Sequence, residues 1–318
     1  MVQQKVKYTD TERTPAERAR ALLEEMTLDE KMAQLGCIFP FGDSYDDMEQ
    51  QALEMPYGIG QVSTLEMRRI GTLEEAAGWQ RKMQETVMRQ SPHHIPAIFH
   101  MEGLCGAFIQ EGTSFPSGIA RGSGWDPELE EKIAKVVAKQ EAACGITHIL
   151  APVLDISRDS RMGRQGETYG EDPALAAALG AAYTKGIQTT EAGGRRPESV
   201  AKHFLGFHNS QGGIHGTNSD TPSRLMEEIY GKPFQSAISE SELKGVMPCY
   251  NSIDGEPASV SHRLLTELLR EKMGFDGLCV SDYGGINNAH EVQRIGETIG
   301  ETAVSYTHLR AHETAANL

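Results

Sequence analysis

The sequence predicts an α/β fold, a (β/α)8 barrel of the TIM type that is incomplete at its C-terminal end. Short apolar runs alternate with longer amphipathic stretches from residue 59 onward, as in parallel strands joined by right-handed crossovers. A doubly wound sheet shows the same alternation but usually carries a glycine-rich turn after its first strand, whereas Gly58 and Gly60 flank the start of the first run. We count about six strand–helix units, fewer than closure requires.

Each element is predicted by its apolar pattern and its end signals. Helix starts are marked at Asp126-Pro127 and Asp172-Pro173, where Asp is suited to the N-cap and Pro to the first turn. The expected strands are 59–63, 95–99, 147–151, 199–203, 245–250 and 277–281. The expected helices are 14–35, 73–89, 127–143, 173–188, 223–238 and 262–273.

The barrel domain is expected to cover residues 1–303. Residues 304–314 read VSYTHLRAHET, which is one reading frame of a synthetic adapter used to prepare sequencing libraries, and they show no helical stripe. We therefore expect residues 304–318 to be an adapter artefact that is disordered and lies outside the fold.

Composition narrows the classes of partner. The 318 residues carry a net charge of −15 without a basic cluster, which argues against nucleic acid and suits a neutral substrate. The five cysteines are irregularly spaced and indicate reduced structural thiols, not a zinc site. No apolar span suggests a membrane helix or a signal peptide, so we expect a cytoplasmic protein. We expect neither a metal nor another cofactor, and the oligomeric state stays open.

Functional groups follow several of the expected strands. Lys202 and His203 end one apolar run and Asp282 follows another, while Glu102 enters a glycine-bearing loop. Because the C-terminal ends of parallel strands carry the chemistry of barrel enzymes, these side chains are predicted to share one rim, with Met247 and Tyr250 beside them. Taken alone, the carboxylates of Glu102 and Asp282 fit helix capping equally well.

Five ordered motifs resemble one family, glycoside hydrolase family 3, over about residues 14–296. They are FPSGIARGSGWDPEL, APVLDISRDSRMGRQGETYGEDP, AKHFLGFHNSQGG, VMPCYNSIDGEP and GFDGLCVSDYGGI. The resemblance implies a retaining, exo-acting hydrolase that removes β-linked glucose or xylose from small oligosaccharides or from aryl or alkyl glycosides. Asp282 would be the nucleophile. The residues in positions that would bind or line the sugar subsite are Glu102, Arg161, Lys202, His203, Met247, Tyr250 and Tyr283.

The source of the general acid/base divides the family. The resemblance favours the two-domain, β-glucosidase-like branch, whose acid/base lies in a following domain that this chain lacks. A single-barrel, β-N-acetylhexosaminidase-like branch uses a loop His paired with an Asp two residues earlier. Here His215 has the matching spacing, but Gly213 occupies the position of that Asp.

Two further readings stay open. Lys202 could be the Schiff-base lysine of a barrel aldolase, although His203 and Asp282 would then have no role. The chain could also be an inactive or merely carbohydrate-binding barrel fragment, because the count of strands falls short of a closed barrel.

Overall fold

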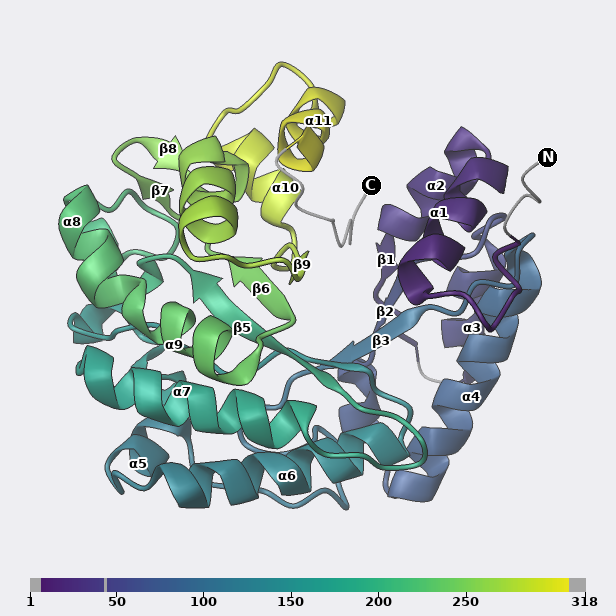
Figure 1. Ribbon diagram of the computed structural model, residues 1–318, viewed down its shortest axis with the longest axis horizontal. Helices are drawn as coiled ribbons and strands as arrows, with labels where there is room; N and C mark the ends of the chain where they lie inside the picture. Colours follow the sequence, from purple (N-terminus) through teal and green to yellow (C-terminus); the bar gives the residue numbers. More distant parts are fainter. Residues whose placement is uncertain (1–6, 43–44, 309–318) are drawn as a thin grey trace.

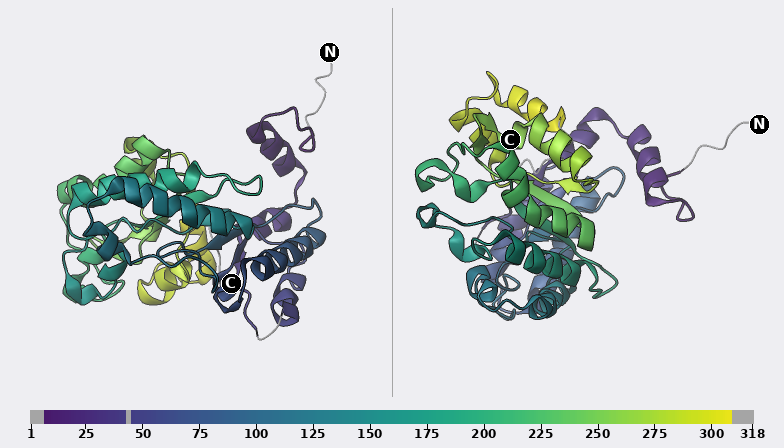
Figure 2. Two further views of the ribbon diagram at one scale, coloured as in Figure 1. Left: turned by 90° about the horizontal axis from the view of Figure 1, so that it is seen from below. Right: turned by 60° about the vertical axis from the view of Figure 1, so that its left-hand side comes forward.

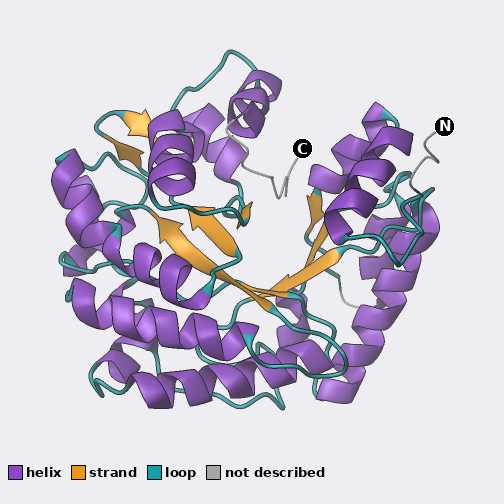
Figure 3. Cartoon of the chain, viewed as in Figure 1, coloured by secondary structure: helices purple, strands orange, loops and turns teal. Residues whose placement is uncertain are grey.

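The computed structural model describes residues 7–42 and 45–308. In this part of the chain seven parallel strands form one curled sheet, in which each strand pairs with the next in sequence (Figures 1 and 3). The strands of this sheet are β1 (Cys37–Ile38), β2 (Gln61–Ser63), β3 (Ile98–Met101), β4 (His148–Ile149), β5 (Glu198–Phe204), β6 (Gly245–Pro248) and β9 (Leu278–Cys279). A separate antiparallel hairpin is formed by β7 (Ser252–Ile253) and β8 (Glu256–Pro257).

Helices cover the outer face of the sheet (Figures 1 and 2). The long helices α6 and α7 pack side by side, and α7 also packs against α9. The α-helices are α1 (Pro15–Glu25), α2 (Leu28–Leu35), α3 (Tyr45–Leu53), α4 (Leu73–Gln90), α5 (Gly118–Gly122), α6 (Pro127–Ala143), α7 (Pro173–Gln188), α8 (Ser223–Leu225), α9 (Lys232–Ser241), α10 (Gly285–Asn287) and α11 (Ile299–His308). The π-helical segment Arg263–Lys272 lies between β8 and β9.

The predicted fold class is confirmed: the chain forms an incomplete (β/α)8 barrel. All six expected strands are present, usually shortened by a few residues. The count is corrected to seven because β1, with only two residues in the ladder, gave too short an apolar signal to be recognised. Each strand is followed by its crossover on the outer face, so all seven C-terminal ends point to one rim.

Local capping explains where several helices begin. Asp126 accepts a hydrogen bond from Leu129 N at the start of α6, and Asp172 accepts two from the first turn of α7, each followed by Pro as predicted. The single helix expected over 14–35 is wrong. The chain leaves the first helix at Met26, and the Thr27 hydroxyl caps α2 in a capping box with Glu30.

The helix expected over 223–238 is interrupted. Residues Met226–Tyr230 are π-helical, and α9 begins afresh with Pro233 in its first turn. Proline has no N–H to continue a ladder, and it is tolerated at that position. The helix expected over 262–273 is present as the π-helical segment Arg263–Lys272.

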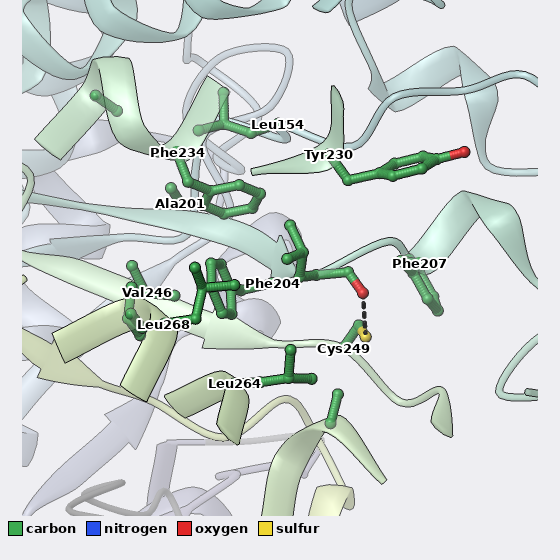
Figure 4. Packing of buried hydrophobic residues seen from close by; sticks show 14 of the residues in the cluster. Leu154, Ala201, Phe204, Phe207, Tyr230, Phe234, Val246, Cys249, Leu264 and Leu268 are labelled. Carbon is green, nitrogen blue, oxygen red and sulfur yellow. Dashed lines mark hydrogen bonds between the residues drawn. The ribbon is translucent and has the colours of Figure 1, made fainter. Parts of the chain in front are cut away.

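Apolar side chains fill the space on both faces of the sheet. One buried cluster lies between β5, β6 and the helices α7 and α9, and Figure 4 shows Phe204 and Phe234 at its centre. Their rings meet edge to face at 5.1 Å. The Cys249 thiol at its margin donates to the Leu205 carbonyl. Inside the barrel a small layer joins Leu150, Val200, Met247 and Val280.

The C-terminal helix crosses the expected domain boundary at residue 303. Thr298 caps the start of α11, and the Ser305 hydroxyl donates to the Glu301 carbonyl within it. The expected disorder is therefore wrong for residues 304–308, which continue the helix through His308. Residues 309–318, also included in that expectation, lie outside the described residues.

Candidate active site

A cluster of charged side chains occupies the rim where the strands end. Glu102 directly follows β3, and Asp155 lies in the loop after β4. Lys202 and His203 are near the C-terminal end of β5, and Asp282 follows β9. All but Glu102 are buried. Burying charged groups is costly unless they are paired, so their partners define the site.

Lys202 and Glu102 form a tight ion pair. The Lys202 ammonium donates to Glu102 Oε2 at 2.5 Å, joining β5 to β3 across the intervening β4. Lys202 is paired in register with Met247 of β6. The predicted proximity of Glu102 and Lys202 is therefore present in the structure, and the pair leaves one oxygen of Glu102 for another donor.

His203 stands at the centre of the cluster. Its Nδ1 lies 2.8 Å from Asp155 Oδ2 and its Nε2 lies 3.2 Å from Arg164 Nη2. Burial lowers the pKa of His203 well below its ordinary value, against the attraction of Asp282 and together with the repulsion of Arg164. A neutral ring with its proton on Nδ1 donates to Asp155 and accepts from Arg164, so both ring nitrogens have protein partners.

Asp155 contacts both the ring and the backbone of His203. Its carboxylate also accepts from the backbone N–H of His203, at 3.2 Å. Burial raises the pKa of Asp155 to about 6, although the nearby His208 and Arg164 favour its charged form. The carboxylate therefore holds the imidazole of His203 in one orientation.

Asp282 has one bonded and one unbonded carboxylate oxygen. Its Oδ1 accepts from the backbone N–H of Tyr283 at 2.7 Å, whereas its buried Oδ2 accepts no hydrogen bond within the described part of the chain. Oδ2 lies 3.6 Å from His203 Nε2, beyond hydrogen-bond distance. One carboxylate oxygen is thus both unbonded and directed into the cluster.

Arg161 does not join this cluster. Its side chain is 68% exposed and forms a local ion pair with Asp159. The cluster receives Arg164 instead, which makes a bidentate pair with Glu167 at 2.7 and 2.8 Å and lies over the Phe207 ring. The loop that contains both arginines turns between them at Gly163, which has a left-handed φ of 85°. The expected sugar contact of Arg161 is corrected to a surface role.

The remaining predicted residues occupy three different positions. Tyr250 lies beside the nucleophile candidate: burial, and next Asp282, raises its pKa above the usual range. Its hydroxyl donates to the Tyr283 carbonyl at 2.5 Å. Tyr283 carries its own hydroxyl toward Ser63. Met247 is buried in the interior layer beneath the rim, where it packs with apolar side chains.

His215 also reaches the rim. Its ring lies 5.0 Å from the rings of Phe207 and Tyr250, and burial, then Arg164, lowers its pKa. Gly213 has a φ of 67°, and a Cβ there would lie 2.5 Å from the Arg161 Cβ. The backbone therefore has no room for the Asp that a His–Asp pair in this loop would require.

Sequence reasoning missed Asp155, Arg164 and Glu167 as members of the site. The sequence indicated only that such a partner exists, because a buried Lys and His at a strand end require a nearby carboxylate. Which of the acids and arginines of the loop 155–172 would supply it depended on the loop's fold.

Two separate hollows lie away from the rim residues. One of about 560 Å³ is lined by α3, α4 and the segment between β2 and α4. The other, of about 680 Å³, lies beside Trp125 and the start of α7. Neither hollow is lined by Asp282, so the candidate active site is defined by the charged side chains at the rim and not by the size of a cavity.

Among the described residues no group of His, Cys, Asp and Glu is arranged to hold a metal ion. The helices of this part of the chain are also too short or too polar to cross a membrane.

Comparison with known proteins decides the family. The model of the glycosyl hydrolase family 3 N-terminal domain matches residues 27–305. The chain belongs to glycosyl hydrolase family 3. The fold agrees with solved family members: a β-glucosidase from Erythrobacter marinus superposes with a TM-score of 0.90 at 30% identity, covering 98% of this chain and 42% of that one.

Two relatives indicate the range of activities in the family. A β-xylosidase of Formosa agariphila is 35% identical over 66% of this chain, and a β-glucosidase of Rhizobium radiobacter is 37% identical over 58%. A Listeria innocua β-glucosidase solved in complex with glucose superposes with a TM-score of 0.84 at 26% identity, covering 95% of this chain and 42% of that one. The chain spans 30% and 22% of the lengths of the first two relatives.

Proposed function

We propose that this family 3 chain supplies the nucleophile half of a retaining β-glycosidase that releases glucose or xylose from the non-reducing ends of small glycosides. The observation that carries the proposal is the position of Asp282 after β9, where its buried Oδ2 accepts no hydrogen bond within the described part of the chain and lies 3.6 Å from His203 Nε2. Names of relatives support both sugars, and the cytoplasmic location expected from the sequence stays a prediction.

Asp282 Oδ2 would attack the anomeric carbon while the bond from that carbon to the leaving oxygen breaks. The leaving oxygen takes a proton from a general acid, and a covalent glycosyl-aspartate remains. Water then attacks the anomeric carbon, gives its proton to the same group now acting as base, and frees Asp282. The Lys202–Glu102 pair and Tyr250 would contact sugar hydroxyls at the rim and orient the neutral substrate.

We propose that the general acid lies outside the described residues. A retaining mechanism needs a second carboxyl group about 5–5.5 Å from the first. Within the described part of the chain, Glu102 is bound to Lys202, Asp155 to His203 and Glu167 to Arg164. We therefore infer that the acid/base comes from a following domain of the longer protein, as the lengths of the relatives also suggest.

A fluorinated substrate separates the nucleophile from the acid. A 2-deoxy-2-fluoro-β-glucosyl or β-xylosyl fluoride has a leaving group that needs no proton, so the chain should form a stable adduct without its acid/base. Mass spectrometry should then locate the added sugar on a peptide containing Asp282. Asp282→Asn should not be labelled, because the amide is a poor nucleophile.

The matched control is Asp276→Asn, an exposed aspartate six residues earlier, which should be labelled like the unaltered chain. Adduct formation on another residue, or labelling that survives in Asp282→Asn, would show that the nucleophile is misassigned. Hydrolysis of an aryl glycoside whose leaving group is not activated would indicate a general acid inside the chain. His215 would then be the first residue to replace.

A further inference from the structure

Tyr283 reaches from the last strand of the sheet to the first three. It follows Asp282 after β9, yet its hydroxyl lies 3.0 Å from Ser63 Oγ at the end of β2 and 3.2 Å from His100 Nε2 on β3. Its ring meets Phe39, just after β1, edge to face at 5.3 Å. Because β9 and β1 are at opposite ends of the strand order, this one side chain spans the mouth of the open barrel.

The Tyr283 hydroxyl is occupied on two sides by the protein. Burial, followed by repulsion from His148 and Lys202, lowers the pKa of His100 to about 3, so its ring is neutral. Whichever tautomer His100 adopts, the Tyr283 hydroxyl can donate to one neighbour and accept from the other. In either case a protein acceptor lies within hydrogen-bond distance of its only hydrogen.

The backbone of Tyr283 is fixed as well. Its N–H donates to Asp282 Oδ1, and its carbonyl accepts from the Tyr250 hydroxyl. These contacts leave Asp282 with one bonded oxygen and one free oxygen. The orientation of the Asp282 carboxylate therefore depends on where the Tyr283 peptide lies, and that depends on the anchored ring.

We propose that Tyr283 is a positioning residue for the nucleophile, which holds the Asp282 carboxylate by tying its peptide across the mouth to Ser63 and His100. This inference rests on the proposed function and changes the role of Tyr283 from sugar binding to the support of Asp282. Loss of the hydroxyl alone should then slow glycosyl transfer to Asp282 without weakening the binding of the sugar.

The test uses residues 1–318 with a 2,4-dinitrophenyl 2-deoxy-2-fluoro-β-glycoside, whose inactivation rate constant and inhibition constant are measured separately. Tyr283→Phe keeps the ring against Phe39 and removes the hydroxyl. It should lower the rate constant about tenfold, the worth of one hydrogen bond, and change the inhibition constant less than about twofold. Ser63→Ala should act in the same direction and non-additively with it. Tyr57→Phe, an exposed tyrosine outside the site, is the matched control.

Amide hydrogen exchange gives a second readout that needs no reaction. Tyr283→Phe and Ser63→Ala should speed exchange at the Tyr283 amide about tenfold, while Tyr57→Phe leaves it unchanged. An inhibition constant that rises with an unchanged rate constant would assign Tyr283 to sugar binding and overturn the proposal. So would unchanged exchange at this amide. If the unaltered chain is not labelled at all, the proposed function fails, and the exchange result still decides whether Tyr283 holds this peptide.

Discussion

Replacing Lys202 by methionine tests how far the rim depends on one buried ion pair. The substitution keeps the length of the side chain but leaves the Glu102 carboxylate without its cation, with the two side chains 3% and 16% exposed in the parent. Removing one partner of a buried pair costs about 3–5 kcal/mol. Because Glu102 keeps some contact with water, we expect the lower end, a loss of about 3 kcal/mol in the free energy of unfolding, measured by urea denaturation and circular dichroism.

The control is an ion pair at the surface with the same distance between nitrogen and oxygen. Lys135 and Glu131 are also 2.5 Å apart, on α6, with exposures of 44% and 21%, and Lys135→Met should cost less than about 0.5 kcal/mol. The double variant Lys202→Met/Glu102→Gln should recover part of the loss, giving a coupling energy of about 2 kcal/mol. Additive losses, with coupling below about 0.5 kcal/mol, would refute the buried pair as the source of the effect.

Three further outcomes follow from the geometry. His100 has a folded-state pKa of about 3 against an ordinary value of 6.5, so its stabilisation is complete above pH 6.5 and is lost as the pH falls toward 3. His100→Gln should therefore remove about 1.4 kcal/mol per pH unit from the slope of stability against pH near pH 5, and an unchanged slope would contradict the neutral ring. Arg164→Gln should lower the rate of labelling by the fluorinated glycoside at least about tenfold, whereas Arg161→Gln should leave it unchanged; the reverse order would restore Arg161 to the site. Gly103→Ala should destabilise the chain by about 2 kcal/mol in urea denaturation, because the new Cβ would lie 2.4 Å from a side-chain carbon. Gly78→Ala on α4, where the new Cβ would meet no atom within 4 Å, should not destabilise it. Equal effects would show that the packing around Gly103 is not tight.

The parts of the fold that local chemistry determines were predictable from sequence. Asp-Pro pairs located the starts of α6 and α7 because the cap and the first turn depend on adjacent residues. The break between α1 and α2 carried a comparable signal in the Thr27–Glu30 capping box, which the continuous apolar spacing of this region obscured. The two-residue strand β1 gave none, because strand pairing comes from a neighbour distant in the chain.

The residues of the site also fall into a group that was predictable from sequence and a group that was not. Glu102, Lys202 and Asp282 could be grouped because parallel strands deliver their C-terminal ends to one rim whatever the loops do. Arg161 and Arg164 could not be distinguished, since they are three residues apart in one loop with carboxylates on both sides. The turn at Gly163 and the bidentate contact of Arg164 with Glu167 decide which of them is directed inward.

The two edge strands of the sheet are not paired with each other in the described part of the chain, so side-chain contacts join the two sides of the rim. β1 and β9 end the sheet, and each has only two residues in its ladder, so neither offers a long edge for pairing. Within the described residues no ladder joins β9 to β1. Asp282 is therefore connected to Glu102 through four strand pairings, or directly through Tyr283 and its contacts with Ser63 and His100. Small displacements accumulate along the longer route, whereas a nucleophile must keep its position to within about 0.5 Å. The direct route is thus the one that can hold Asp282 accurately relative to Glu102 on the opposite side of the rim.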